Sequence, residues 1–324
     1  MNYNTDFKKE IIQKLSDNKK SLNTITNYIR NLELINDGLP LKSLKFLENS
    51  EKIISKLKDK KENTYRTYLI SIVGVLKSMG KEKTKYYKQY HEVMMDLNKK
   101  LGKEEASGKP SETMKKEWIN WEDVIKRYNQ LKKEFDEITG KLATKYEWDE
   151  VILPTMTLAL YVLNPPRRSE DYTECYIVKN KKDDKTKNYL ILDEKRFYFN
   201  VFKTSKTAPE AEKTLDIPPK LMEVINKYMI YHPKLINTKV NNKTEERFLI
   251  KFNGKPLNKI NGMTKLLNKI FNKKFGASML RHSYLTNKYF IVNEQMRKDA
   301  LAMGHSTGTQ KTYIKDIKET ELEV

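Results

Sequence analysis

Apolar residues recur at intervals of three or four over most of the first hundred residues, which is the spacing of amphipathic helices. The clearest stripe consists of Leu22, Ile25, Ile29, Leu32 and Ile35. Ser21 precedes this stripe as a candidate N-cap, and Asp37-Gly38-Leu39-Pro40 is a turn sequence that ends it. Similar stripes predict further helices near 7–15, 46–57, 64–76 and 83–101. Residues 1–101 are therefore expected to form a bundle of four or five short helices.

The pattern changes after residue 101. Residues 102–117 contain glycines, a proline and no apolar periodicity, so we expect a flexible linker there. Asn120 is placed to cap a helix that begins at Trp121. Residues 151–163 are apolar almost throughout and should form a buried helix that stops at Asn164-Pro165-Pro166. A second domain is therefore expected over 118–324.

Three runs in this second domain have the composition of strands. They cover residues 189–192, 196–202 and 214–218, and aromatic and β-branched residues dominate them. Helical periodicity resumes at residues 220–231 and continues, with loops, towards the C-terminus. The predicted fold is thus mainly α, with a small antiparallel β-sheet in the second domain.

The charge balance points to a polyanionic partner. Lysine and arginine together number 63 against 43 acidic residues, a formal net charge of +20. Such an excess favours nucleic acid or an anionic membrane surface. No apolar run has the length of a membrane-spanning helix, and the first residues lack the apolar core of a signal peptide. Nucleic acid is therefore the better expected partner, with no membrane association, and a general abundance of lysine is the alternative explanation of the charge.

Cysteine and histidine usage argues against metal and disulfide chemistry. Cys175 is the only cysteine, so no intrachain disulfide can form and a reducing, intracellular compartment is expected. The four histidines lack metal-ligand spacing with one another or with Cys175. No glycine-rich phosphate loop is present, so neither ATP nor NAD is implied. We expect no metal and no cofactor.

A set of phosphate-handling residues lies in the second domain. Pro165-Pro166-Arg167-Arg168-Ser169-Glu170 supplies one arginine, and Leu280-Arg281-His282-Ser283 supplies another. Met303-Gly304-His305-Ser306 follows, and Tyr313 comes eight residues after His305. Two arginines, a histidine and a tyrosine in this order suggest chemistry on a DNA phosphodiester.

These motifs resemble those of the tyrosine recombinase (phage-integrase) family. Arg167-Arg168-Ser169-Glu170 is similar to the family's Arg-x-Ser-Glu motif, and the segment around Arg281 is similar to its second arginine box. Met303-Gly304-His305-Ser306 resembles its Leu-Gly-His-Ser element. The resemblance implies a helical core-binding (SAM-like) domain over 1–101 and a catalytic domain over 118–324, with Tyr313 where the family has its nucleophile.

The resemblance implies a role for each of these residues. Arg167 and Arg281 would hold the non-bridging oxygens of the scissile phosphate, which suits the planar, permanently charged fork of arginine. Arg168 would exchange roles with Arg167 if the motif were shifted by one place. Tyr313 would attack phosphorus and form a 3′-phosphotyrosyl bond, which requires no cofactor. His305 would hydrogen-bond the phosphate or the tyrosine oxygen.

A lysine on the family's β-hairpin acts as general acid towards the departing 5′-oxygen. Lys203 matches that lysine, and Lys206 is a close competitor; plain surface charge is the alternative for either in so lysine-rich a chain. One departure concerns the histidine that the family has three residues before its second arginine, because this chain has Ser278 there. Ser278 could contact phosphate or cap a helix that begins at Met279. His282, one helical turn later, could substitute for the missing base or could be a packing residue.

The resemblance implies a site-specific DNA recombinase or integrase that works as a homotetramer on paired sites in double-stranded DNA. The amino-acid usage and the serine are similar to those of integrases from virophages, large DNA viruses and eukaryotic mobile elements, which implies DNA integration of a viral or mobile genome. The alternatives are a type IB topoisomerase and a catalytically silent DNA-binding relative. Both the recombinase and the topoisomerase hypotheses require the Tyr313 hydroxyl to lie beside Arg167 and Arg281.

Overall fold

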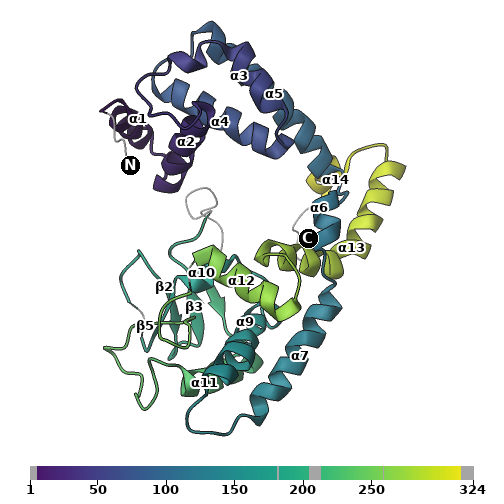
Figure 1. The fold of residues 1–324 in the computed structure, drawn as a ribbon. Coiled ribbons are helices and arrows are strands. Elements are labelled where there is room, and N and C mark those ends of the chain that lie inside the picture. Colours follow the sequence, from purple (N-terminus) through teal and green to yellow (C-terminus); the bar gives the residue numbers. More distant parts are fainter. Residues whose placement is uncertain (1–5, 181, 204–212, 258, 315–324) are drawn as a thin grey trace, which may run out of the picture. The chain divides into compact units, whose positions relative to one another are not determined.

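The computed structural model describes residues 6–180, 182–203, 213–257 and 259–314. The chain divides into two compact units, an N-terminal unit (Met1–Pro110) and a C-terminal unit (Ser111–Val324) (Figure 1). The division falls inside segment 102–117. Much of that segment is helical, because α5 (Lys85–Ala106) runs into it and α6 (Glu112–Glu117) follows, which leaves 107–111 between the two helices.

The N-terminal unit is a helical bundle, as the apolar periodicity predicted. Its helices are α1 (Asp6–Asp17), α2 (Leu22–Ile35), α3 (Ser50–Lys58), α4 (Glu62–Ser78) and α5, with the 3-10 turn η1 (Lys45–Leu47) before α3. Ser21 caps α2, since its side chain accepts a hydrogen bond from the backbone N–H of Thr24. The predicted stripe residues Ile25, Ile29, Leu32 and Ile35 are all buried in the core, whereas Leu22 is exposed.

Helices α2 and α4 approach closely at a glycine. A Cβ atom at Gly74 would lie 2.5 Å from a ring carbon of Tyr28, closer than two carbon atoms can approach. Nearby, the amide of Asn31 on α2 donates to the hydroxyl of Ser71 on α4 over 2.8 Å. The glycine therefore permits the close packing that buries both apolar stripes.

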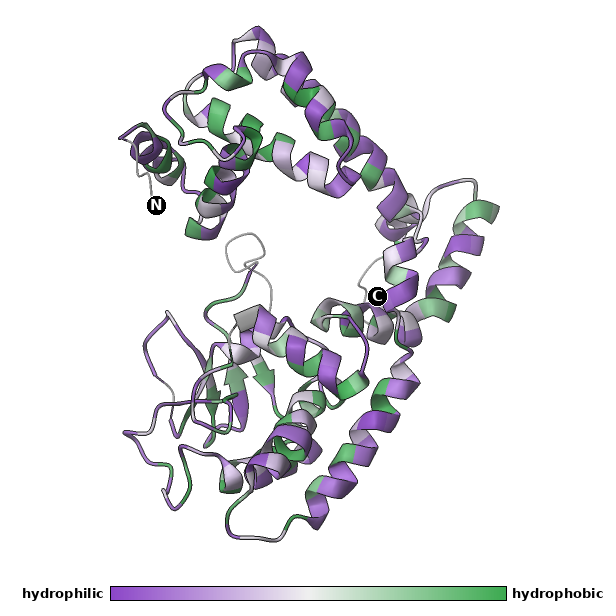
Figure 2. Ribbon diagram, in the orientation of Figure 1, coloured by the Kyte–Doolittle hydropathy of each residue, from purple (hydrophilic) through white to green (hydrophobic). Residues whose placement is uncertain are grey.

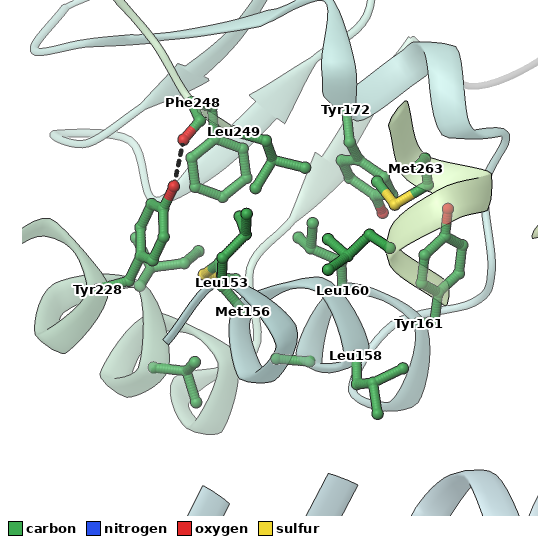
Figure 3. Packing of buried hydrophobic residues seen from close by; sticks show 14 of the residues in the cluster. Leu153, Met156, Leu158, Leu160, Tyr161, Tyr172, Tyr228, Phe248, Leu249 and Met263 are labelled. Atoms are coloured by element: carbon green, nitrogen blue, oxygen red, sulfur yellow. Dashed lines mark hydrogen bonds between the residues drawn. The ribbon is translucent and has the colours of Figure 1, made fainter. Parts of the chain in front are cut away.

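The C-terminal unit is built around one fully buried helix. This helix, α9 (Leu153–Val162), continues a π-helical turn, η2 (Trp148–Ile152), and every residue from Leu153 to Tyr161 is buried. Helices α7 (Trp121–Glu137) and α11 (Pro219–Tyr231) pack against it. Figure 3 shows Leu153, Met156, Leu160 and Tyr161 packed beneath Tyr172, Phe248, Leu249 and Met263. The apolar run at 151–163 was correctly predicted to form the core.

The unit contains further helices and strands. They are α8 (Lys145–Glu147), α10 (Ser169–Thr173), α12 (Lys259–Phe271), α13 (Ala277–Ala302) and α14 (Thr307–Tyr313), with strands β1 (Cys175–Val178), β2 (Asn188–Ile191), β3 (Arg196–Tyr198), β4 (Thr214–Asp216) and β5 (Glu246–Arg247). Among the described residues, no helix is long and apolar enough to cross a bilayer.

The sheet has the order β4-β3-β2-β1-β5 and is mixed. The three predicted strands are present, and β2, β3 and β4 pair antiparallel. The prediction of a wholly antiparallel sheet was wrong, because β1 runs parallel to β2, with Cys175 opposite Asn188 and Val178 opposite Ile191. Strand β1 escaped prediction because it has only four residues, follows α10 directly and shows no clear polar alternation.

Candidate functional site

Arg167 is held by an ion pair and by an aromatic face. The chain leaves α9 at Asn164-Pro165-Pro166, and α10 begins two residues after Arg167. Because Asp171 lies four residues further on, its carboxylate reaches back to Arg167, and Nε donates to Oδ2 over 2.9 Å. The guanidinium carbon lies 4.0 Å from the centre of the Phe199 ring. One edge and one face of the guanidinium are therefore occupied by the protein.

The aromatic support beneath Arg167 belongs to the core. Phe199 stacks with Phe197, and Tyr172 meets both rings edge-on at centroid distances of 5.9 and 5.5 Å. All three of these rings are completely buried. The support is therefore rigid, and stacking of a cation on such a face is favourable.

Arg281 reaches the same place from a distant part of the chain. It lies in the second turn of α13, whose buried residues Met279 and Leu280 anchor it to the core. Burial and the charge of Arg168 lower the pKa of Arg281, with a further contribution from Arg167, and the carboxylate of Asp171 opposes the shift. The charges of Arg167 and Arg168 therefore interact electrostatically with that of Arg281. These three arginines and Asp171 are called the arginine centre below.

Asp171 is the acidic member of this centre. Asp171 is only 3% exposed. Burial raises the pKa of Asp171, and the charges of Arg167, Arg168 and Arg281 oppose that rise. One carboxylate thus interacts electrostatically with three guanidiniums contributed by two segments more than a hundred residues apart in sequence.

The lysine candidates lie on the segment after β3. Lys203 is exposed and directly follows Phe202, whose ring centre is 5.8 Å from the guanidinium carbon of Arg167. The backbone of Lys203 therefore directly follows a residue that lies near Arg167. Lys206 lies outside the described residues.

Ser278 and His282 are both exposed on α13. The helix begins at Ala277 with Gly276 at the N-cap position, so the prediction that Ser278 caps a helix starting at Met279 was wrong. The helix therefore starts at the buried Ala277, two residues before the start that the serine signal indicated. His282 flanks Arg281 in sequence and does not share its burial.

His305 and Tyr313 form a second, separate pair. Helix α13 ends at Ala302, and Gly304 follows with a φ of +74°, the left-handed conformation that glycine adopts readily. The N–H groups of Gly304 and His305 donate to the carbonyls of Leu301 and Ala300, the pattern of a Schellman C-cap. Ser306 then caps the short helix α14, with its side chain accepting from the N–H of Thr309.

This local geometry brings the two rings together. Their centroids are 5.5 Å apart at an interplanar angle of 34°. Tyr313 is 69% exposed, and His305 is half-buried. The eight-residue spacing between them is thus explained by one helix end, one cap and one short helix. The two residues are called the His–Tyr pair below.

The arginine centre and the His–Tyr pair lie apart in this structure. Helix α13 is continuous from Arg281 to Ala302, a path of about 30 Å at ~1.5 Å per residue. Figure 1 shows α14 well separated from α10. The expectation that the Tyr313 hydroxyl lies beside Arg167 and Arg281 is therefore not met in this conformation.

Asp171 is the site residue that the sequence reasoning missed. Its signal was available, because an acidic residue four positions after an arginine at the start of a helix is placed to pair with it. The family's motif ends at Glu170 and therefore does not include Asp171. The motif's own glutamate is only half-buried, with its backbone carbonyl accepting from Glu174.

Within the described part of the chain, no group of three or more His, Cys, Asp or Glu residues is placed to hold a metal ion. Comparison with protein-family models, with curated proteins and with solved structures finds no match to this chain.

Proposed function

We propose that this chain is a site-specific DNA recombinase or integrase that cleaves and rejoins DNA through a 3′-phosphotyrosyl intermediate on Tyr313. The observation that carries the proposal is the arginine centre. Arg167 and Arg281 come from distant segments and act on one another despite their mutual repulsion. A cluster of partly buried like charges is costly unless an anion completes it, and a phosphodiester has the matching charge and oxygen geometry.

In the proposed reaction the Tyr313 oxygen attacks phosphorus and the bond from phosphorus to the 5′-oxygen breaks. Lys203 gives a proton to the departing 5′-oxygen, and His305 or water takes the proton of the phenol. The arginine centre stabilises the charge that develops on the non-bridging oxygens, usually the largest contribution to such a rate. Attack of the 5′-hydroxyl of a second strand on the phosphotyrosyl bond reverses the step and rejoins DNA.

This mechanism requires α13 to rearrange so that Tyr313 reaches the phosphate. The surface of α13 offers a place for the break. Tyr289, Phe290, Ile291 and Val292 are consecutive and exposed, Ile291 by 82%. Figure 2 shows hydrophobic residues among the hydrophilic ones along α13. Four consecutive positions point in four directions around a helix, so no single surface can cover them while the helix is continuous.

The next residues suit the start of a new helix. Asn293 is a favoured N-cap residue, and Glu294 would lie in the first turn, where an acidic side chain interacts well with the helix dipole. Ile291 and Val292 are β-branched and lose side-chain freedom in a helix. A break at 291–293 would let the second half of α13 carry the His–Tyr pair to the arginine centre.

A nicked suicide substrate tests the proposal directly. A duplex selected for tight binding from random sequence would carry a nick near the cleavage site, so that the short cleaved fragment diffuses away and traps the adduct. Wild-type protein should form a covalent complex that resists denaturation, and Tyr313→Phe should form none. Pairing of two such duplexes by a protein tetramer would support recombination. Relaxation of a supercoiled plasmid without paired sites would instead favour a type IB topoisomerase.

A second candidate function is DNA binding without cleavage. It is favoured by the separation between the His–Tyr pair and the arginine centre, and by Ser278 in place of the family's histidine. This candidate predicts no adduct from wild-type protein on any duplex that it binds tightly. Both functions predict that affinity for DNA falls steeply with salt, because many phosphates are contacted.

A further inference from the structure

The arginine centre contains a carboxylate whose position needs explanation. A negative charge beside a phosphate site weakens anion binding by simple repulsion. Burial of a carboxylate is also costly unless it is paired and hydrogen-bonded. Asp171 is nonetheless almost fully buried, pairs with Arg167 and interacts electrostatically with Arg168 and Arg281.

The contacts of Arg167 suggest what the carboxylate does. Its Nε is engaged by Asp171 Oδ2 at 2.9 Å, and its face is engaged by Phe199. A guanidinium held by Nε and by one face keeps the edge that carries its two terminal nitrogens for another partner. That edge is the one that binds two oxygens of a phosphate side by side.

The second carboxylate oxygen adds to this picture. Oδ1 of Asp171 is buried and has no hydrogen-bond partner among the described residues. It faces a centre in which Arg168 and Arg281 also act on the carboxylate. A buried, unpartnered carboxylate oxygen is rare and costly, so it marks a place where function rather than stability sets the residue.

We propose that Asp171 is a positioning residue of the arginine centre, which holds Arg167 by its Nε edge and offsets the repulsion among the three arginines so that they bind one phosphate together. This inference rests on the proposed function, because it assumes that the centre binds phosphate. It goes beyond the family resemblance, whose motif ends at Glu170.

The test uses inorganic phosphate as the probe and thermal unfolding of the full-length protein as the readout. A ligand that binds only the folded state raises its melting temperature as its concentration rises. Sodium phosphate would be compared with sodium chloride at equal ionic strength, for wild type, Asp171→Asn and the double variant Arg167→Ala, Arg281→Ala. The double variant measures phosphate binding by other basic residues and is subtracted.

Glu174→Gln is the matched control. Glu174 also pairs with an arginine, Arg247, over 2.9 Å, and it lies three residues after Asp171. Both substitutions remove one negative charge from the same short stretch of chain. Only the Asp171 substitution removes a contact within the arginine centre.

Positioning and simple electrostatics predict opposite signs. If Asp171 positions Arg167, Asp171→Asn should bind phosphate about tenfold more weakly than wild type, the usual order for partners that orient a binding side chain. If it does not, loss of its negative charge should leave the affinity unchanged or tighten it, as Glu174→Gln should. Tighter or equal binding by Asp171→Asn overturns the proposal.

Two further measurements keep the outcomes separate. Melting temperatures without phosphate show whether Asp171→Asn folds, because removing one partner of a buried ion pair is itself destabilising. Wild-type protein with no phosphate-dependent shift beyond that of the double variant would also overturn the inference. Specific phosphate binding without any DNA adduct would instead contradict the proposed cleavage while leaving the role of Asp171 intact.

Discussion

The arginine centre and the His–Tyr pair are constructed in opposite ways. The centre joins segments far apart in sequence, and it rests on completely buried aromatic rings. The pair is local, formed by one helix end and one short helix, and Tyr313 is largely exposed. Under the proposed function, phosphate binding would thus depend on the core of the C-terminal unit, whereas the nucleophile would depend on an outlying helix. The two functions should therefore respond separately to mutation.

Among variants that keep Tyr313, the largest effect on cleavage alone is expected from the general acid. Lys203→Ala should slow adduct formation by about 10²–10⁴-fold, the usual contribution of proton transfer to a leaving group. A substrate with sulfur in place of the departing 5′-oxygen needs no such proton and should restore the rate. Lys213→Ala, an exposed lysine on the far side of the same connection, serves as the control.

Failure of the sulfur substrate to restore the rate of Lys203→Ala would remove Lys203 from the general-acid role. The same pair of substrates applied to Lys206→Ala would then show whether that lysine supplies the proton. Plain surface charge, the alternative for both, predicts small losses that the sulfur substrate does not change.

The next largest effect should come from the arginine centre. Arg167→Lys keeps the charge and loses the planar fork and the Nε contact to Asp171. Adduct formation should fall by about 10²–10³-fold, as for loss of one preorganised donor. Arg196→Lys is the control, because Arg196 pairs with Asp216 at the outer edge of the sheet. Equal rates for Arg167→Lys and wild type would exclude Arg167 from phosphate contact.

A smaller effect tests the break in α13. Asn293→Ala removes the proposed N-cap and favours the continuous helix, at a cost to the broken form of about 1 kcal/mol. Adduct formation should therefore fall about fivefold, with phosphate binding at the arginine centre unchanged. Asn293→Asp keeps a capping side chain and should cleave at the wild-type rate. Faster cleavage by Asn293→Ala would show that the continuous helix is the active form.

The smallest effect concerns pH. Burial raises the pKa of Asp171, so its carboxylate takes up a proton at a higher pH than an exposed aspartate, which titrates near 4. Cleavage should decline as pH falls through this raised pKa, because the protonated group holds Arg167 less well. Stability should change in the opposite sense, since the ionised form is the one that burial disfavours.

In Asp171→Asn both dependences should disappear, and pH profiles of adduct formation and of melting temperature measure them. If adduct formation by this variant still declined at low pH as in wild type, the decline would belong to the titration of another group. The titratable and charged groups around Asp171 are Arg167, Arg168, Tyr161, Tyr172, Cys175 and Arg281.

Much of the fold could be predicted because local chemistry and packing agree in it. Ser21 caps the helix that its position indicated, and the apolar run at 151–163 is the core. The parallel β1–β2 pair could not be predicted, because pairing direction depends on the path of the connecting chain and not on strand composition. The predicted start of the linker at residue 102 was wrong, because the polar residues 102–106 continue α5.

The candidate site divides in the same way. The turn at Gly304 and the cap at Ser306 are local, so the sequence motif indicated both the helix end and the nearness of His305 to Tyr313. The distance from Tyr313 to the arginines depends on whether α13 is continuous, which weak local preferences at 289–293 do not decide. Asp171 is recognisable only once its burial is known.

The most direct test of the central claim is the chemical identity of a trapped DNA adduct. Wild-type protein would be incubated with the nicked duplex, digested with protease, and the DNA-linked peptide sequenced by mass spectrometry. A 3′-phosphate joined to Tyr313, absent from Arg167→Ala and Arg281→Ala, is the predicted result. An adduct on any other residue, or none on a duplex that the protein binds tightly, would contradict it.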